Sequence, residues 1–295
     1  MRARLGVGLV GAGAWGRTVH APGLADHPGM RLTGVWTRRP DPAAALAERF
    51  GTRVFGSFAE LLDSVDAVAF AVPPSIQAEL APQAAAAGKH LILERPLATD
   101  LDGARRIADS VGEHGVVALM MLTLRYALQT RDWLAGLAEV GGWAGGSARW
   151  LSGALLGEVY GNSPWRHAEG ALADIGPHAF DLLDAALGEI TCVLAARRDS
   201  NDLWHVLLEH SGGATSTVTL TNRLPIRPTV VEFAVYGEPG FRSLAGKPHS
   251  QADSYTSLLD DFAAMVASAT LDHPCDVRRG VHLQRVIADC LRRLP

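Results

Sequence analysis

The first sixteen residues constrain the fold more than any other stretch of the chain. An apolar run, Leu5–Val10, leads directly into Gly11, Gly13 and Gly16, spaced G-x-G-x-x-G, and a helical pattern follows. A dinucleotide site requires this order. The first glycine makes the tight turn, the second lets backbone approach a pyrophosphate, and the third lets helix and strand pack closely. The helix N-terminus then faces the phosphates, so the sequence predicts a nucleotide-binding domain here.

Short apolar segments alternate with helical patterns up to about residue 120. The predicted strands are 5–10, 30–36, 54–55, 66–72, 90–93 and 116–120. Helical patterns fill every interval between them, which predicts right-handed βαβ units in a doubly wound parallel sheet of the Rossmann type.

The pattern changes after residue 121. Helices are expected over 124–138 and 170–187, with a loop before Trp165. Strands are expected at 143–152, 190–197, 203–210, 214–222 and 230–236, and two helices at 253–269 and 276–293. This half reads as an α+β domain with an open, mixed, largely antiparallel sheet. The expected fold class is therefore α/β, with a dinucleotide-binding domain over 1–120 and a substrate and oligomerisation domain over 121–295.

Composition excludes several classes of protein. The chain is 48% hydrophobic and 20% charged, with a formal net charge of −4 and no long run of like charge. Nucleic acid and anionic membrane surfaces are therefore not expected partners, and no stretch is apolar enough to span a bilayer. Three cysteines lie far apart without a C-x-x-C pair, and the N-terminus lacks a signal-peptide cleavage site. Both features favour a reduced, cytoplasmic location. Zinc-type ligand spacing is missing as well, so no metal is predicted.

Four segments together resemble the glucose–fructose oxidoreductase, inositol dehydrogenase and rhizopine-catabolism family (Gfo/Idh/MocA). They are Val7–Gly16, Ala71–Pro74, Leu93–Leu97 and Gly170–Asp181, of which the last is the most specific. The resemblance covers nearly the whole chain. It implies a Rossmann domain joined to a mixed-sheet domain, and oxidation or reduction of sugars, cyclitols and related small molecules with NAD or NADP. It also implies a homodimer or homotetramer formed through the open sheet of the second domain.

The tip of the second strand bears on the choice of cofactor. An acidic residue there would bind the adenosine ribose, but the chain has Thr37, Arg38 and Arg39. Arginine forks pair with a 2′-phosphate, which favours NADP over NAD. The competing interpretation is that these arginines are solvated turn residues in an arginine-rich chain. The expected cofactor-binding residues are Gly11, Gly13, Ala14, Trp15, Gly16, Thr37, Arg38, Arg39, Val72, Pro73 and Glu94.

Hydride transfer needs a group that moves one proton, and His178 has the appropriate neutral-range chemistry. Asp174 lies four residues earlier, on the same face of the predicted helix, where it would anchor a substrate hydroxyl or orient the imidazole. Taken alone, the pair also fits a core histidine beside an aspartate at a helix start. The resemblance implies that His178 is the acid–base and that Asp174 binds substrate.

Glu94-Arg95-Pro96 departs from the family pattern Glu-Lys-Pro, in which the lysine touches substrate and nicotinamide. Arginine stays charged and offers a planar donor fork, so Arg95 is suited to polarise a carbonyl or grip a carboxylate but not to relay protons. Gln77 departs similarly, since family members often carry histidine there. The pattern implies a cis peptide before Pro96, whereas the base rate for such bonds favours trans.

These departures keep two further functions open: an imine or keto reductase of a specialised pathway, and a dinucleotide-binding sensor or assembly protein without turnover. His178, Asp174 and Arg95 form the expected catalytic set, while Arg125, Tyr126 and His20 also have structural interpretations, His20 as a packing or capping residue. The expected substrate-binding residues are Arg95, Arg125, Trp165, Arg166, Asp174 and His178.

Overall fold

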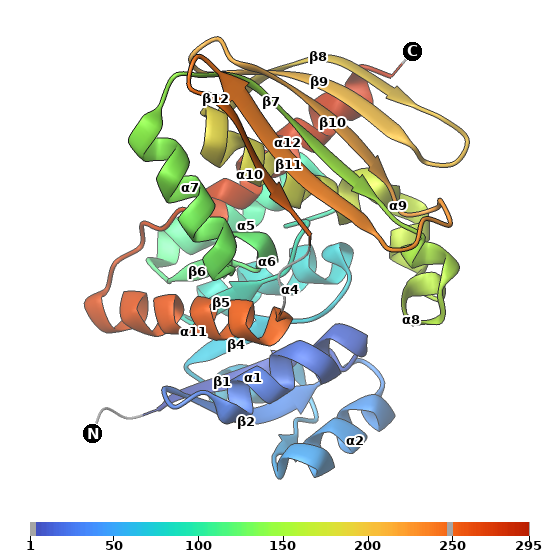
Figure 1. The fold of residues 1–295 in the computed structure, drawn as a ribbon. Helices are drawn as coiled ribbons and strands as arrows, with labels where there is room; N and C mark the ends of the chain where they lie inside the picture. The colour runs from blue at the N-terminus through green and yellow to red at the C-terminus, as the bar shows by residue number, and fades with distance from the viewer. Residues whose placement is uncertain (1–3, 247–249, 295) are drawn as a thin grey trace. The chain divides into compact units, whose positions relative to one another are not determined.

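The computed structural model describes residues 4–246 and 250–294, and its contacts divide the chain into two compact units (Figure 1). Unit 1 comprises residues 1–126 and 250–281, and unit 2 comprises residues 127–249 and 282–295. The expected domains, 1–120 and 121–295, stay a prediction. Unit 1, as the contacts define it, draws in addition on a segment late in the chain.

Unit 1 contains a six-stranded sheet in the order β3-β2-β1-β4-β5-β6, in which every neighbouring pair is parallel. Its strands are β1 (Leu5–Val10), β2 (Met30–Trp36), β3 (Arg53–Val54), β4 (Ala67–Phe70), β5 (His90–Leu93) and β6 (Ala118–Met120). All four residues of β4 are buried, as expected for a parallel strand covered on both faces. Strand order reverses between β1 and β4, which is where doubly wound sheets bind their ligands. The parallel Rossmann-type sheet is thereby confirmed.

Helices connect or flank these strands, and local sequence explains several of the helix ends. They are the π-helical turn η1 (Gly16–His20), α1 (Ala21–Asp26), α2 (Pro40–Phe50), α3 (Phe58–Asp63), α4 (Pro74–Ala86), α5 (Leu101–His114), α6 (Thr123–Tyr126) and α11 (Gln251–Ser268). The side chains of Ser57 and Asp100 accept backbone N–H bonds at the starts of α3 and α5. Gly51 and Gly115, both left-handed, end α2 and α5.

Unit 2 contains a second six-stranded sheet, in the order β12-β11-β7-β10-β9-β8. Its strands are β7 (Trp143–Leu151), β8 (Ile190–Arg198), β9 (Trp204–His210), β10 (Thr215–Thr221), β11 (Val230–Gly237) and β12 (Gly240–Ala245). Only β7 and β10 pair in parallel among these neighbours, so the sheet is mixed and largely antiparallel, as predicted. The sequence interpretation missed β12.

One face of this sheet is covered by helix and the other is open. Helix α10 (Gly176–Leu187) contacts β7, β8, β10 and β11. Along β9, burial alternates strictly: Val206 and Leu208 are buried, whereas His205, Leu207 and Glu209 are exposed. This alternation is typical of an antiparallel strand with one face on the core.

Three expectations for the middle of the chain are wrong in detail. The helix expected over 124–138 is two helices, α6 and α7 (Leu128–Val140). The loop expected before Trp165 contains η2 (Ala154–Leu156) and α8 (Glu158–Gly161), and Trp165 itself lies in α9 (Pro164–Asp174). The helix expected over 170–187 is broken: Gly170 has φ 72°, and α9 ends before α10 starts at Gly176.

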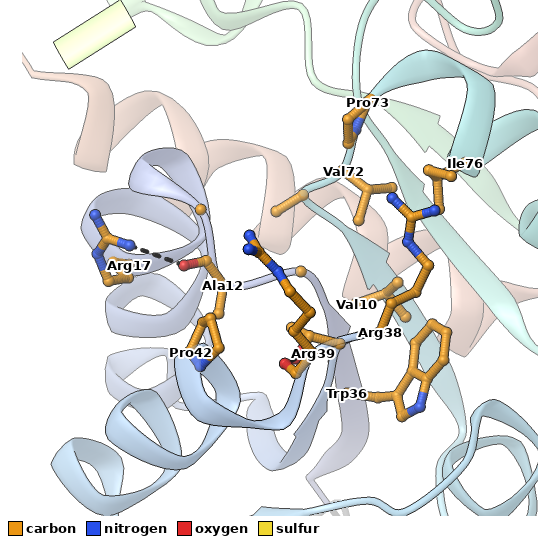
Figure 2. A pocket seen from close by; sticks show the side chains of 14 residues that line it. Val10, Ala12, Arg17, Trp36, Arg38, Arg39, Pro42, Val72, Pro73 and Ile76 are labelled. Atoms are coloured by element: carbon orange, nitrogen blue, oxygen red, sulfur yellow. Dashed lines mark hydrogen bonds between the residues drawn. The ribbon is translucent and has the colours of Figure 1, made fainter. Parts of the chain in front are cut away.

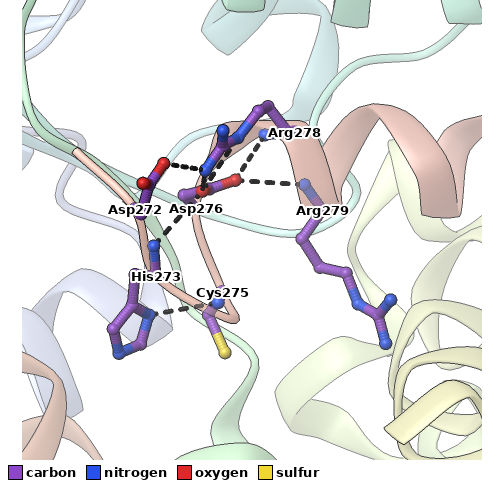
Figure 3. Close-up of polar contacts among 6 residues, drawn as sticks. All are labelled: Asp272, His273, Cys275, Asp276, Arg278 and Arg279. Carbon is purple, nitrogen blue, oxygen red and sulfur yellow. Dashed lines mark hydrogen bonds and ion pairs between the residues drawn. The ribbon is translucent and has the colours of Figure 1, made fainter.

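Polar contacts around Asp276 tie the segment before α12 (Val277–Arg292) to the first turn of that helix (Figure 3). The Asp276 carboxylate accepts hydrogen bonds from the backbone N and the side-chain Nε of Arg278, at 2.9 and 3.0 Å. The backbone N of Met120, in β6, donates to Cys275 O at 2.8 Å. Across residues 4–246 and 250–294, no helix combines the length and apolar character that crossing a membrane requires.

Candidate functional site

The glycine turn of unit 1 has the backbone that its sequence predicts. Gly11 has φ 108°, and a Cβ atom there would collide with the carbonyl of Ala71 at the end of β4. A Cβ at Gly16 would lie 2.8 Å from Gly11 O, so the helix can approach the strand only because both residues are glycine. Gly13, by contrast, has open space on its Cβ side. The turn therefore leaves room at its middle glycine, where a pyrophosphate would approach the backbone.

A pocket of about 320 Å³ opens beside this turn, at the carboxyl ends of β1, β2 and β4 (Figure 2). Its lining residues are Val10, Gly11, Ala12, Gly13, Arg17, Trp36, Thr37, Arg38, Arg39, Pro42, Ala71, Val72, Pro73 and Ile76. Seven of the expected cofactor-binding residues, Gly11, Gly13, Thr37, Arg38, Arg39, Val72 and Pro73, are among them. The structure therefore brings together the glycine turn, the tip of β2 and the Val72-Pro73 corner.

Positive charge dominates the pocket. Arg17, Arg38 and Arg39 contribute guanidinium groups, and no aspartate or glutamate is among the lining residues. Figure 2 shows Arg38 and Arg39 extending into the pocket from the connection between β2 and α2. The Nη1 atom of Arg17 donates to Ala12 O at 2.9 Å, which holds this guanidinium against the glycine turn. A pocket of this kind suits an anion such as a pyrophosphate or a 2′-phosphate.

The remaining expected cofactor residues lie outside this lining. Ala14, Trp15 and Gly16 form the helical start after the glycine turn. Trp15 is half-buried, and its indole N–H is buried without a hydrogen-bond partner among the described residues. Glu94 follows β5, where its carboxylate accepts a hydrogen bond from His20.

Glu94 belongs to a buried network within unit 1. Its Oε1 atom lies 2.8 Å from His20 Nε2, and His20 Nδ1 lies 3.0 Å from the hydroxyl of Tyr255 in α11. An ionised carboxylate can only accept, so Nε2 carries the proton donated to Glu94, and in a neutral imidazole Nδ1 then accepts from the tyrosine hydroxyl. Burial, and next the charge of Glu94, raise the pKa of Tyr255 well above its usual value, which keeps the hydroxyl protonated.

The segment that carries Arg95 is held by Gln77 of α4. The amide of Gln77 bonds to the backbone N and O of Glu94 and to Leu97 O. The Arg95–Pro96 peptide is cis, as the family pattern implies. Arg95 lies in unit 1, and so does Arg125, which belongs to the short helix α6.

In unit 2, Asp174 and His178 do not share one continuous helix, which corrects the sequence interpretation. Asp174 is the last residue of α9 and His178 lies in the first turn of α10, with Ile175 between the two helices. Both side chains are buried. The imidazole of His178 stacks on Trp150 of β7, with ring centroids 5.5 Å apart and an interplanar angle of 19°. The pairing on one helix face, inferred from a spacing of four, does not apply across this break.

The Asp174 carboxylate is held by two side chains of unit 2. Its Oδ1 accepts from Arg166 Nε at 3.1 Å, and its Oδ2 accepts from Asn222 Nδ2 at 2.8 Å. Asn222 Oδ1 in turn accepts from the hydroxyl of Ser152 at 2.9 Å. Arg166 and Asp174, both expected substrate-binding residues, therefore contact each other directly. Asn222 is a hydrogen-bond partner of Asp174 that the sequence interpretation missed.

Arg166 also stacks on two aromatic rings. Its Cζ atom lies 4.4 Å from the ring centroid of Trp165 and 4.6 Å from that of Tyr160. These distances allow cation–π contact, which favours a fixed guanidinium orientation. Trp165, Arg166, Asp174 and His178 are thus all residues of unit 2, whereas Arg95 and Arg125 are residues of unit 1.

Several site residues had no usable signal in the sequence. Asn222 and Ser152 are ordinary polar residues at strand ends, and only the fold places them beside Asp174. Arg17 did have a signal, because it follows Gly16 on the helix that starts at the glycine turn. Trp36 and Ile76 contribute apolar walls to the pocket in unit 1, and each stands next to a segment that the sequence interpretation did select.

The comparisons agree with this architecture. Residues 5–122 match the family described as oxidoreductase family, NAD-binding Rossmann fold, and residues 146–241 match the GFO/IDH/MocA C-terminal domain. A dTDP-3,4-didehydro-2,6-dideoxy-α-D-glucose 3-reductase of Actinomadura kijaniata is 36% identical over 117 residues, which are 38% of this chain and 35% of that protein. The chain therefore aligns with little more than a third of this curated relative's length.

Solved structures cover almost the whole chain. The GenD2 protein of gentamicin A biosynthesis, in complex with NAD, superposes with a TM-score of 0.86 at 23% identity, covering 99% of this chain and 95% of its own. A 3-ketoreductase of Actinomadura kijaniata, in complex with NADP, superposes with a TM-score of 0.78 at 20% identity, covering 99% and 98%. At these identities the likeness shows the fold.

Both halves of the chain thus match one family, each in the unit where the structure shows the corresponding sheet. The model that matches residues 5–122 describes an NAD-binding Rossmann fold, which supports a nicotinamide dinucleotide as cofactor. This protein is a member of the Gfo/Idh/MocA family of oxidoreductases.

Proposed function

We propose that this protein is an NAD(P)-dependent oxidoreductase. It transfers a hydride between a nicotinamide cofactor and a small sugar-like, cyclitol or other carbonyl or hydroxyl compound. The observation that carries the proposal is the pocket beside the glycine turn, which is cationic and lies at the switch point of a parallel sheet. The relative that reduces a dTDP-linked keto sugar supports a sugar-like substrate.

NADP is the preferred cofactor under this proposal. Arg38 and Arg39 follow Trp36 at the tip of β2 and line the pocket, where a carboxylate that binds the ribose 2′-hydroxyl would otherwise stand. Two guanidinium groups and no acidic side chain favour a 2′-phosphate, which carries charge that a ribose hydroxyl lacks. The bound cofactor would accept or supply the hydride and would rest its pyrophosphate on the glycine turn.

The proton is assigned to His178. In the oxidative direction, its imidazole takes the proton of the substrate hydroxyl while the carbinol hydrogen leaves with its electron pair, and reduction reverses both transfers. The Asp174 carboxylate, which Arg166 and Asn222 hold in place, accepts a hydrogen bond from a substrate hydroxyl. Arg95 polarises the reacting oxygen by its fixed charge. Arg125, Trp165 and Arg166 complete the proposed substrate-binding set.

Arg95 favours a second candidate function. Because an arginine cannot be tuned to exchange protons, a keto or imine reductase that needs only a fixed cation there is the nearest alternative. A dinucleotide-binding sensor or assembly protein without turnover is the candidate from a different class, motivated by the same residue and by Gln77.

Assembly, domain roles and location are proposals too. The exposed face of β9 includes Leu207, and Leu194, Tyr236 and Phe241 are exposed on other strands of the same sheet. Apolar side chains on an uncovered sheet support a homodimer or homotetramer formed through unit 2. We assign residues 1–120 to cofactor binding, residues 121–295 to substrate binding and oligomerisation, and the protein to the cytoplasm.

Binding and turnover test the proposal in sequence. NADPH is expected to quench the intrinsic tryptophan fluorescence at lower concentration than NADH, and a panel of sugars, inositols and ketones is expected to change absorbance at the nicotinamide band. His178→Ala should abolish that turnover and leave the affinity for NADPH nearly unchanged. Wild-type protein that binds neither cofactor overturns the function. Binding without turnover of any compound selects the sensor.

A further inference from the structure

Gln77 is a buried polar residue that the proposed mechanism does not use. It lies in α4, and its side chain is fully buried. Its Nε2 donates to Glu94 O at 2.8 Å and to Leu97 O at 2.9 Å, and its Oε1 accepts from Glu94 N at 2.8 Å. One side chain therefore satisfies three backbone groups on either side of Arg95.

Only an amide can make this set of bonds. The three contacts need two N–H donors on one atom and one acceptor, which glutamine supplies. A neutral imidazole has one donor and one acceptor, and a protonated one has two donors and no acceptor. Family members often carry histidine at position 77 and lysine at position 95. In this chain Gln77 supplies the donors and the acceptor that the backbone on either side of Arg95 requires.

The segment is also tied from the other side. The Glu94 carboxylate accepts from His20 Nε2 at 2.8 Å, and His20 lies on η1, the helical turn that follows the glycine motif. Residue 94 thus has its backbone N, its backbone O and its carboxylate engaged, by two different helices. The backbone that precedes Arg95 has little freedom to move relative to the glycine turn.

Sheet order places this segment at one end of the cofactor site. All strands of unit 1 are parallel, so Glu94 follows β5 at the same sheet edge as the pocket beside β1, β2 and β4. In doubly wound sheets the dinucleotide lies across the switch point, with one mononucleotide on each side. The arginines at the tip of β2 occupy the adenosine side, so the end of β5 lies on the nicotinamide side.

We propose that Gln77 is a positioning residue for the nicotinamide end of the cofactor site, acting through the backbone of Glu94 and Leu97 to fix Arg95. The inference rests on the proposed function, because it requires a bound nicotinamide dinucleotide. It assigns to Gln77 no contact with cofactor or substrate.

The test compares a whole cofactor with a fragment of it. NADPH carries the nicotinamide ring, whereas 2′-phospho-ADP-ribose carries the adenosine end and the pyrophosphate but lacks the ring. Calorimetry measures both dissociation constants for wild type, Gln77→His, Gln77→Met and the control Gln83→His. Gln83 lies on the same helix α4 but is exposed, and its amide donates to Glu79 O of its own helix.

Gln77→His loses at least one of the three bonds and is expected to weaken NADPH binding by about fivefold. Gln77→Met fills the space but loses all three, so its loss is expected to be larger. Neither variant should change the affinity for 2′-phospho-ADP-ribose, and Gln83→His should bind both ligands as wild type does. Unchanged fragment binding also shows that the variant is folded.

Two results overturn the inference. The first is NADPH binding by Gln77→His that equals wild type. The second is a loss that is equal for NADPH and for the fragment, since a general loss of structure moves both. Should Gln77→Met fail to fold, Gln77→His decides alone. Wild-type protein that binds neither NADPH nor NADH overturns the proposed function and this inference with it. If wild type prefers NADH, the same comparison uses NADH and ADP-ribose.

Discussion

The Nε2 atom of His20 lies 2.8 Å from the Oε1 atom of Glu94, across a separation of 74 residues. The imidazole is fully buried, and the glutamate side chain is 12% exposed. The pair joins the helical turn after the glycine motif to the end of β5. Removing one partner would leave a carboxylate in a largely apolar setting, which costs more free energy than the intact pair contributes.

We therefore expect His20→Ala to lower the free energy of unfolding by about 3 kcal/mol, measured by urea denaturation. Tyr255→Phe removes only the hydroxyl that bonds to His20 Nδ1 and should cost about 1 kcal/mol. A His20→Ala protein as stable as wild type would show that the contact adds no net stability.

The arginines at the tip of β2 should decide between the two cofactors. The double variant Arg38→Ala/Arg39→Ala should lose about 2 kcal/mol of NADPH binding, roughly thirtyfold in Kd, because charge-assisted bonds to a phosphate are lost. NADH binding should stay the same, and added salt should weaken NADPH binding more than NADH binding. Arg49→Ala, on the exposed side of α2, is the matched control. Equal losses for both cofactors would contradict the assignment of the 2′-phosphate.

The break within α9 can be tested by adding a single methyl group. Gly170 has φ 72°, and a Cβ there would lie 2.5 Å from the Asp202 carboxylate, which accepts the Ala171 N–H at 2.6 Å. Gly170→Ala should therefore lower the free energy of unfolding by about 2 kcal/mol. Gly136→Ala, inside α7 with open space at its Cβ, should instead raise it by about 0.8 kcal/mol. Calorimetric Tm values for both variants check the opposite signs.

Much of the fold was predictable, because its signals are local. Strands β1, β4, β5 and β6 of unit 1 are largely apolar runs bounded by turn residues, and the glycine turn needs residues without a Cβ. The break at Gly170 was not predictable in the same way. Its left-handed backbone is stabilised by Asp202, a residue from the connection between β8 and β9, and no window around Gly170 contains that partner.

In the candidate site, too, residues with a local sequence signal were predictable and residues that depend on distant contacts were not. Seven lining residues of the pocket in unit 1 were predictable, because each follows a strand whose end the sequence marks. Asn222 was not, since its role depends on β10 ending beside α9. The pairing of Asp174 with His178 on one helix face was wrong because a spacing of four carries that meaning only in an unbroken helix.

Asn222 gives a prediction for unit 2. Asn222→Ala removes the bond to Asp174 Oδ2 and leaves a buried carboxylate oxygen with one partner fewer, so stability should fall by about 2 kcal/mol. If Asp174 binds substrate, KM should also rise, while the Kd for NADPH should not change. Asn201→Ala, in the exposed connection between β8 and β9, serves as the control. A drop in NADPH affinity equal to the rise in KM would count against a role confined to substrate.

His90 predicts how stability depends on pH. Burial lowers its pKa below the usual value, partly opposed by the charge of Asp66, and its Nδ1 accepts the Val117 N–H at 3.0 Å. The unfolded chain therefore binds a proton more readily than the folded one below about pH 6.5, so stability present above that pH is lost as the pH falls. His90→Asn keeps an acceptor but cannot titrate. Its Tm should fall less than that of wild type between about pH 7 and about pH 5.5. Parallel Tm curves would exclude His90 as a source of acid sensitivity.

Unit 1 is assembled from two segments, residues 1–126 and 250–281, and the later one carries Tyr255. During synthesis, the glycine turn and all six strands of the parallel sheet leave the ribosome well before α11 does. The whole sheet of unit 2 is translated between these two segments. His20 can therefore contact Tyr255 only after that sheet has been synthesised. A fragment cut at Tyr126 would thus lack α11 and the tyrosine that His20 contacts, so unit 1 cannot complete its core until this later segment has been translated.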